Sequence, residues 1–378
     1  MAENLLQRDI AERVDALAPR WRERAARTAR DAVLPAQTLE ELFDAELLQI
    51  VTAVRYGGLG SSWPTLAEAA RRAARACPST GWTIGVVGCH AGVASRFPPP
   101  LAEVLFAAGA RQLFATASVT RDGTITREAG GVRIDGEWRF CSGIDHASWL
   151  ILSGVRDDSP ETGRYFIPVR TDRVRVSDTW QVAGMAGTGS KGAILDDVLV
   201  PEESAYPLDA CFAQRTPELP GDEGYLMEVA FIEYVNSAVV GPILGCAEGA
   251  YDEYLDSVRA AGRIGVPTVQ AGIAESAAEL ACARHLYDSI GSVLHTAGMR
   301  RRTLSPMETG ILRRDRAYLA RLCVAAVQRL VGLAGTAAHT EDAVLSRHWR
   351  DLQMMAAHRD VNWATNHVAF AAAVADAG

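Results

Sequence analysis

The sequence predicts an α+β protein with three consecutive parts: a helical amino-terminal part, a central β part and a helical carboxyl-terminal part. The spacing of apolar residues changes twice along the chain. They recur every three or four residues up to about residue 110, alternate with a period of two over about residues 111–215, and return to helical spacing over residues 216–378. A chain of 378 residues also exceeds the roughly 250–300 residues at which single cores stop growing.

The amino-terminal part, residues 1–110, is expected to contain several helices. Apolar side chains such as Ile10, Val14 and Leu17 lie three or four residues apart, as they would on one helix face. Proline and glycine clusters such as residues 78–81 interrupt this pattern. The apolar segment 82–87 then predicts a buried helix that ends near His90.

The central part, residues 111–215, is expected to contain short strands. Apolar and polar side chains alternate in the segments 131–140, 149–153 and 164–169. Asp-Gly pairs at residues 122–123 and 135–136, and the Asp-Asp-Ser-Pro cluster at residues 157–160, supply the turn residues that antiparallel strands require.

The final part, residues 216–378, is expected to be a helical bundle. Residues 217–222, which contain two prolines and a glycine, separate it from the β part. Alanine-rich stretches at residues 271–294 and 313–333 favour long helices, because alanine has the highest helix propensity. Long helices bury their apolar faces against one another, which predicts the bundle.

Composition and charge exclude several classes of function. A formal net charge of −8 provides no positive field to attract nucleic acid or an anionic membrane. The seven cysteines are never spaced Cys-x-x-Cys, which argues against a disulfide framework and a zinc site. The amino terminus lacks the apolar core of a signal peptide, and no apolar run approaches membrane-spanning length. We therefore expect a cytoplasmic protein without membrane or nucleic-acid partners.

The glycines of residues 187–192 match the spacing of a dinucleotide-binding loop. Such a loop must follow a buried strand and open a helix. Here the strand-like segment 193–200 follows instead. The sequence therefore predicts no nicotinamide-binding module at this point. An ordinary glycine-rich turn is one interpretation of these glycines.

Three segments carry a more specific signal. They are Trp138-Arg-Phe-Cys-Ser-Gly143, Gly184-Met-Ala-Gly-Thr-Gly-Ser190 and Arg347-His-Trp-Arg-Asp351, the last of which is followed by His358. Together they resemble the flavin-dependent monooxygenases that share the acyl-CoA dehydrogenase fold. The resemblance extends over nearly the whole chain. It implies a helical domain at residues 1–110, an antiparallel β-barrel domain at residues 111–215 and a four-helix bundle at residues 216–378.

The same resemblance implies a flavin site. In the family, the loop that matches residues 184–190 lies beside the flavin, and the strand that matches residues 138–143 brings a serine, here Ser142, close to flavin N5. A hydroxyl at that point can hold a hydrogen bond to the flavin or to its oxygen adduct. The alternative is a strand serine bonded only to backbone. The implied cofactor-binding residues are Ser118, Trp138, Ser142, Thr188, Ser190 and Arg263.

Arg263 enters this set on two grounds. It lies four residues after Arg259, a spacing that would place both guanidinium groups on one helix face, where they could hold a phosphate. The residues after it resemble a family segment that meets the flavin phosphate across a subunit interface. We favour Arg263 over Arg259, and an exposed arginine without a ligand is the alternative.

The substrate side of the site is implied by two further matches. Residues 77–82 with His90 resemble a family helix whose histidine faces the substrate cavity, which implies roles for Trp82 and His90. A lone histidine at a helix end is otherwise more often a surface or capping residue. Thr116 matches a position on the strand that enters the β domain and lines the site in relatives, although simple strand packing is an alternative.

His358 decides between two chemistries. Acyl-CoA dehydrogenases abstract a substrate proton with a carboxylate near the end of the chain, but no glutamate occurs here after Glu341. In the related hydroxylases a histidine stands where this chain has His358. A histidine that titrates near neutral pH can deprotonate a phenol. We expect His358, Ser142 and His90 to be the catalytic residues, with His367 as a second choice for the base and a helix-end histidine as the alternative reading of His358.

The function implied is that of an oxygenase component in a two-component system. A separate reductase would supply reduced flavin, FMNH2 or FADH2, which would react with O2 to a C4a-hydroperoxide and transfer one oxygen atom to a small molecule. Aromatic or polyketide-type phenols are the expected substrates. The alternatives are N-oxygenation of an amine, as in amino-sugar nitrososynthases, an acyl-CoA dehydrogenase that retains FAD, and a non-enzymatic flavin binder or scaffold. The resemblance also implies a homotetramer.

Overall fold

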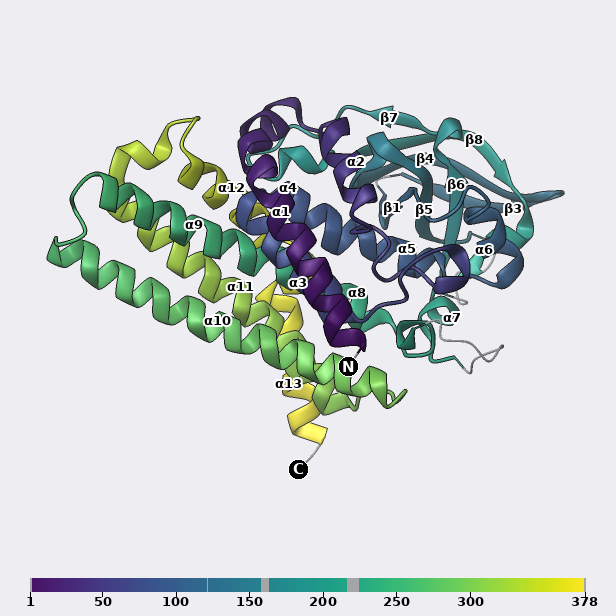
Figure 1. Cartoon of the computed structure of the whole chain (residues 1–378). Helices are drawn as coiled ribbons and strands as arrows, with labels where there is room; N and C mark the ends of the chain where they lie inside the picture. Colours follow the sequence, from purple (N-terminus) through teal and green to yellow (C-terminus); the bar gives the residue numbers. More distant parts are fainter. Residues whose placement is uncertain (1, 121, 158–162, 216–223, 377–378) are drawn as a thin grey trace.

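The computed structural model of the chain describes residues 2–120, 122–157, 163–215 and 224–376, and it has the predicted order of helices, sheets and helices (Figure 1). The prediction of an α+β fold is confirmed. The expected segment boundary at residues 217–222 and part of the turn at residues 157–160 lie outside the described residues.

The amino-terminal helices are α1 (Ala2–Asp31), α2 (Ala36–Asp44), α3 (Trp63–Ala76), α4 (Pro78–Trp82), the π-helical turn η2 (Thr83–Val87), α5 (Gly88–Ala94) and α6 (Pro99–Leu105). The small side chains of α3 allow close packing against α1, α4 and the turn η2. Residues 78–94 form one continuous helical path that ends at Ala94. His90 therefore lies inside a helix, and the prediction that it ends one is wrong. Gly92 lies inside this helix, where an added Cβ would come within 3.3 Å of Val51 and Phe231.

The central strands form two sheets. The first has the order β1-β5-β6-β9, and the second has the order β2-β4-β8-β7, with β3 paired to β4. The strands are β1 (Leu113–Ala117), β2 (Val119–Thr120), β3 (Thr124–Glu128), β4 (Gly131–Cys141), β5 (Ala147–Val155), β6 (Arg164–Arg170), β7 (Arg175–Ser177), β8 (Lys191–Val200) and β9 (Tyr206–Pro207).

The expected antiparallel barrel needs two corrections. Among the described residues the two sheets do not pair into a closed barrel, because their edge strands make no ladder with each other. The pairing is antiparallel except between β1 and β5, which run parallel. Near its end β4 also contains a register shift between Trp138 and Cys141, where Phe140 has a φ of 62°.

The carboxyl-terminal helices form the expected bundle. They are α8 (Ile232–Ser237), α9 (Val240–Ala260), α10 (Pro267–Met299), α11 (Pro306–Ala334), α12 (Val344–Ala356) and α13 (Trp363–Asp376), whereas the short α7 (Leu208–Phe212) packs against β6 and β9 of the central part. Helices α9 to α12 lie alongside one another, and α13 extends along α11 (Figure 1). A capping box begins α11, in which the Ser305 hydroxyl accepts from the Glu308 N–H and the Glu308 carboxylate accepts from the Ser305 N–H.

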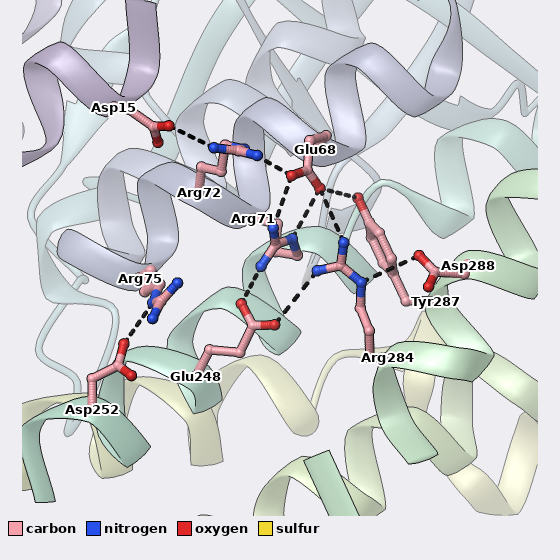
Figure 2. A network of polar contacts seen from close by, with 10 residues as sticks. All are labelled: Asp15, Glu68, Arg71, Arg72, Arg75, Glu248, Asp252, Arg284, Tyr287 and Asp288. Carbon is pink, nitrogen blue, oxygen red and sulfur yellow. Dashed lines mark hydrogen bonds and ion pairs between the residues drawn. The ribbon is translucent and has the colours of Figure 1, made fainter. Parts of the chain in front are cut away.

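A network of charged side chains joins the bundle to the amino-terminal helices (Figure 2). At its centre the Glu68 carboxylate on α3 accepts from Arg71 at 2.8 Å and from Arg72 at 2.7 Å. The Arg71 guanidinium also pairs with Glu248 on α9. Although burial opposes the shift, these arginine contacts lower the pKa of Glu68 to about 2. The network therefore stays ionised at neutral pH and fixes α3 against α9.

One described helix contradicts the expectation that no apolar run approaches membrane-spanning length. The segment Pro306–His339, which contains α11, is long and apolar enough to cross a membrane by length and composition. Its packing is nevertheless that of a core helix, because α11 contacts α9, α10, α12 and α13. It also carries Arg316, whose side chain is only 2% exposed and pairs with Glu233.

Candidate functional site

One cavity lies where the three parts of the chain meet, and it encloses about 450 Å³. This volume falls within the range of roughly 300–1,000 Å³ that is typical of small-molecule sites. Helices α4 and α5, strands β1 and β4, the loop before β8, helix α8 and the turn after α12 supply its walls. Eight of the predicted residues line it: Trp82, His90, Thr116, Ser118, Ser142, Thr188, Ser190 and His358.

Two predicted cofactor residues lie elsewhere. The Trp138 side chain is fully buried and packs over Gly123, where an added Cβ would come within 2.5 Å of its ring. The register shift that follows Trp138 turns Ser142, but not Trp138, toward the cavity. Arg263 is exposed in the turn after α9, which ends at Ala260, so the expected shared helix face with Arg259 does not form. That turn lies at the end of the bundle remote from the sheets (Figure 1).

Hydroxyl groups from two segments form a short chain in the cavity wall. The Ser142 Oγ lies 2.7 Å from the Ser190 Oγ, which lies 2.7 Å from the Thr188 Oγ1. The Thr188 hydroxyl donates to the Met185 carbonyl at 2.8 Å, and the Trp82 indole N–H donates to the Ser142 Oγ at 3.3 Å. This chain links the end of β4 to the glycine-rich loop and to α4.

The glycine-rich loop is held in a strained conformation by the bundle. Met185 has a φ of 56°, in the left-handed region that a side chain disfavours. Its backbone N–H donates to the buried carboxylate of Asp351 on α12. Burial raises the pKa of Asp351 to about 6, although the Met185 N–H and Arg347 act in the opposite direction. Gly184 is required beside it, because a Cβ there would lie 2.1 Å from the Arg350 carbonyl oxygen.

His90 is neutral, and both of its ring nitrogens have partners. Burial lowers its pKa to about 4. Its Nδ1 lies 2.9 Å from the Phe114 carbonyl oxygen, which can only accept, so Nδ1 carries the proton. Its Nε2 therefore accepts from the Thr116 hydroxyl at 3.0 Å. With its hydrogen committed to His90, the Thr116 oxygen offers only lone pairs to the cavity.

His358 lies just beyond α12, in the turn that follows it. Helix α12 ends at Ala356, and His358 caps the following 3₁₀ turn, where its Nδ1 accepts from the Asp360 N–H at 3.3 Å. The Asp360 carboxylate lies 3.5 Å from the same nitrogen. The ring meets the Trp82 ring edge-on at a centroid distance of 5.6 Å. Desolvation lowers the pKa of His358, and Asp360 opposes this shift.

A buried ion pair fixes the turn that carries His358. Arg316 on α11 donates to the Glu233 carboxylate at 2.8 Å and to the Asp360 carbonyl oxygen at 2.7 Å. It also donates to the Asn366 side-chain oxygen at 3.1 Å. Helix α8, which bears Glu233, contributes Asn236 to the cavity wall. One guanidinium group thus connects α8, α11, the 358–361 turn and α13.

Several lining residues were not predicted: two lie within the matched strand 138–143, and two come from segments without a recognisable motif. The most prominent are Phe140 and Trp180, whose rings meet edge-on at 6.1 Å, and Arg139 and Arg359. Phe140 belongs to the matched strand, and its positive φ turns it outward in a way that period-two alternation does not anticipate. Aromatic and apolar walls, a hydroxyl cluster and these two arginines fit a planar ring system that bears an anionic chain, such as a flavin.

Two family models match the chain. The model described as acyl-CoA dehydrogenase, N-terminal domain, matches residues 5–97, and the model described as acyl-CoA dehydrogenase, C-terminal domain, matches residues 237–363. The two models cover most of the amino-terminal helical part and most of the bundle, and residue 363 lies just beyond the His358 turn.

Curated relatives and a solved structure match over nearly the full length. The chain is 28% identical to the oxygenase subunit HsaA, a flavin-dependent monooxygenase of Rhodococcus jostii, over 90% of this chain and 91% of the relative. It is 28% identical to the oxygenase component of an FADH(2)-dependent resorcinol hydroxylase of a Rhizobium species, over 94% of this chain and 91% of the relative. XiaF from a Streptomyces species superimposes with a TM-score of 0.90 at 24% identity, covering 99% and 97% of the two chains. This superposition establishes the fold.

Proposed function

The chain belongs to the acyl-CoA dehydrogenase family, in its branch of flavin-dependent monooxygenases, and from this premise we propose that it is the oxygenase component of a two-component aromatic hydroxylase. The single observation that carries the proposal is the convergence of His358, the hydroxyl chain and the His90–Thr116 pair on one cavity. Relatives named as oxygenase components or subunits imply a separate reductase and a small-molecule substrate.

The cofactor is a reduced flavin, FMNH2 or FADH2, used together with O2. When bound, reduced flavin activates O2 and supplies one oxygen atom to the substrate. Ser118, Ser142, Thr188 and Ser190 are the polar residues of the cavity that would hold its ring system, with Phe140 and Trp180 among the apolar ones. The alternative of an acyl-CoA dehydrogenase requires an unpaired carboxylate. The carboxylate in this cavity, that of Asp360, lies 3.5 Å from His358 and 3.4 Å from Arg359.

A phenol matches the substrate side better than an amino sugar does. Because the Thr116 hydroxyl donates to His90, it can only accept from a bound molecule, for example from an O–H group other than the one that His358 deprotonates. The facing side chains Val86, Val239 and Met354 are apolar and suit the faces of an aromatic ring. We assign His90 the role of orienting Thr116, since both of its nitrogens are already engaged.

We assign His358 the role of the general base. This role requires the tautomer in which Nδ1 carries the hydrogen and faces the Asp360 carboxylate, 3.5 Å away, in place of the bond from the Asp360 N–H; Nε2 is then free to take a substrate proton. Once Nε2 takes that proton, the Asp360 carboxylate stabilises the imidazolium through Nδ1–H. Deprotonation makes a phenol more nucleophilic toward the transferred oxygen atom.

The assembly and the cellular compartment extend the proposal. Exposed apolar side chains on α11 and α13, namely Tyr318, Val368 and Val374, are 45–54% exposed and would be covered in a homotetramer. Arg263, remote from the cavity of its own subunit, would then approach a flavin phosphate in a neighbouring subunit. A cytoplasmic location suits the seven free cysteines, of which six are buried.

The experiment that tests the function is a single turnover with ¹⁸O₂. The purified chain is mixed anaerobically with photoreduced FMN or FAD and a panel of phenols beginning with resorcinol, and ¹⁸O₂ is then admitted. We expect a hydroxylated phenol with one ¹⁸O atom, and no product from oxidised flavin with NADH unless a reductase is added. Product formed from NADH without a reductase, oxygenation confined to amines, or anaerobic desaturation of an acyl-CoA by oxidised FAD would each overturn the proposal.

A further inference from the structure

The hydroxyl chain beside the cavity has a single favourable direction. Each hydroxyl has one hydrogen to donate, and a carbonyl oxygen can only accept. The Thr188 hydrogen is committed to the Met185 carbonyl at 2.8 Å. Thr188 must then accept from Ser190, and Ser190 must accept from Ser142, over two contacts of 2.7 Å each. The reverse direction would leave the Thr188 and Met185 oxygens facing each other without a hydrogen between them.

This direction fixes what Ser142 can offer to a ligand. Its hydrogen points into the wall toward Ser190, and one of its two lone pairs accepts from the Trp82 indole N–H at 3.3 Å. One lone pair remains, and Ser142 lines the cavity. The four side chains are buried, at 4–8% exposure, so water does not compete for these bonds. Toward the cavity, Ser142 is therefore an acceptor and not a donor.

We propose that Thr188 and Ser190 are positioning residues that make the site selective for the redox state of the flavin, by holding Ser142 as an acceptor for the N5–H of reduced flavin. Reduced flavin carries a hydrogen on N5, whereas oxidised flavin has a lone pair there. An acceptor-only Ser142 thus attracts the reduced form and repels the oxidised form. The inference rests on the proposed function and on the placement of flavin N5 close to Ser142 that the family resemblance implies.

The selectivity has a consequence for a two-component enzyme. A site that binds reduced flavin tightly takes it up from solution, and a site that binds oxidised flavin weakly releases it for another round of reduction. The two affinities differ because reduced flavin carries a hydrogen on N5 and oxidised flavin does not. Ser142, oriented by the hydroxyl chain, accepts a hydrogen bond from that N5–H. The carbonyl of Met185, which fixes the direction of the chain, is held in place by the bond from its own residue to Asp351.

The variant that tests the proposal is Thr188→Val, which has nearly the same shape but no hydroxyl. Without the Thr188 oxygen, the Ser190 hydrogen turns to Ser142 and the Ser142 hydrogen turns to the cavity. We expect the preference for reduced over oxidised FMN to fall by roughly threefold to tenfold, the size of one hydrogen bond. The midpoint potential of bound FMN should become about 15–30 mV more negative, since a tenfold change equals about 30 mV for two electrons. Thr188→Ser should restore both values.

Anaerobic titration with oxidised and with photoreduced FMN measures the two dissociation constants without any substrate. A matched control is Thr83→Val, which removes another buried hydroxyl that donates to a carbonyl, that of Ser79 at 3.0 Å, outside the chain. This control should keep the parental ratio. The proposed role of the hydroxyl chain is wrong if Thr188→Val also keeps that ratio. It is also wrong if the variant weakens the binding of both flavin forms equally, as a purely structural defect would. A parental protein that binds neither form would instead refute the proposed function.

Discussion

Replacing His358 by alanine should lower the rate of product formation by roughly 10²–10⁴, the usual contribution of a general base. Binding of reduced flavin and consumption of O2 should continue, because the hydroxyl chain and the glycine-rich loop do not depend on the imidazole. The oxygen that no longer reaches the substrate should appear as hydrogen peroxide. Product and peroxide are measured together in single turnovers of the parental enzyme and the variant.

His367→Ala is the matched control for this result. The His367 ring stacks on Trp363 at a centroid distance of 5.6 Å, its Nδ1 lies 2.6 Å from the Trp363 carbonyl oxygen, and it does not line the cavity. His367 was the second choice for the base on sequence grounds. From the structure we expect that its loss leaves the coupling between O2 consumption and product formation unchanged. Equal losses in the two variants, or parental coupling in His358→Ala, would remove His358 from the mechanism.

The pH dependence follows from the direction of the His358 pKa. Desolvation lowers that pKa below its ordinary value of 6.5, so the imidazole is neutral and able to accept a proton at pH 7. Product formation should therefore be constant at and above neutral pH and should fall on the acid side, below pH 6.5, as His358 becomes protonated. This acid limb should be absent from the residual activity of His358→Ala.

Replacing Arg316 by methionine should lower the free energy of unfolding by about 3 kcal/mol, which is at the lower end of the range for breaking a buried ion pair. Among the described residues, the variant leaves the Glu233 carboxylate, 5% exposed, with Arg313 as its remaining charged partner. It also leaves the Asp360 carbonyl and the Asn366 side chain without their bonds from Arg316. The value is near the lower end because Arg313 remains. Urea denaturation at pH 7 measures the change.

Arg313→Met is the control, since Arg313 pairs with the same carboxylate but is 37% exposed. Solvent screening reduces the contribution of such an exposed pair to the free energy of unfolding to about 0–1 kcal/mol. The comparison therefore isolates the effect of burial at a shared partner. If both variants lose the same stability, or if Arg316→Met loses less than about 1 kcal/mol, the ion pair does not fix the His358 turn.

Local patterns predicted the order of helices and strands, because the apolar period reports directly on which faces are buried. They could not predict that the sheets stay open, since closure depends on pairing between edge strands that are far apart in the sequence. The same limit explains Trp138. The alternation along β4 changes at a register shift, and the side chain that reaches the cavity is that of Ser142.

The site was predicted where a residue belongs to a contiguous motif, as Thr188 and Ser190 do. It was not predicted where the contact depends on a change of chain direction. Phe140 reaches the cavity through a positive φ, and the turn that carries the predicted His358, which Arg316 holds from another helix, was likewise not anticipated. The direction of the hydroxyl chain required the distance from Thr188 to the Met185 carbonyl, which no sequence pattern contains.

The central claim is that this chain binds reduced flavin and controls its reaction with O2 before any substrate reacts. Rapid mixing of the protein, preloaded anaerobically with reduced FMN or FAD, with O2 in the absence of substrate tests it most directly. Oxygen consumption and the absorbance of oxidised flavin are followed in the same reaction. The account predicts that oxygen is consumed first and that the oxidised-flavin absorbance returns only after a lag that free flavin does not have. Return of that absorbance at the rate of free flavin, with no lag, would contradict it.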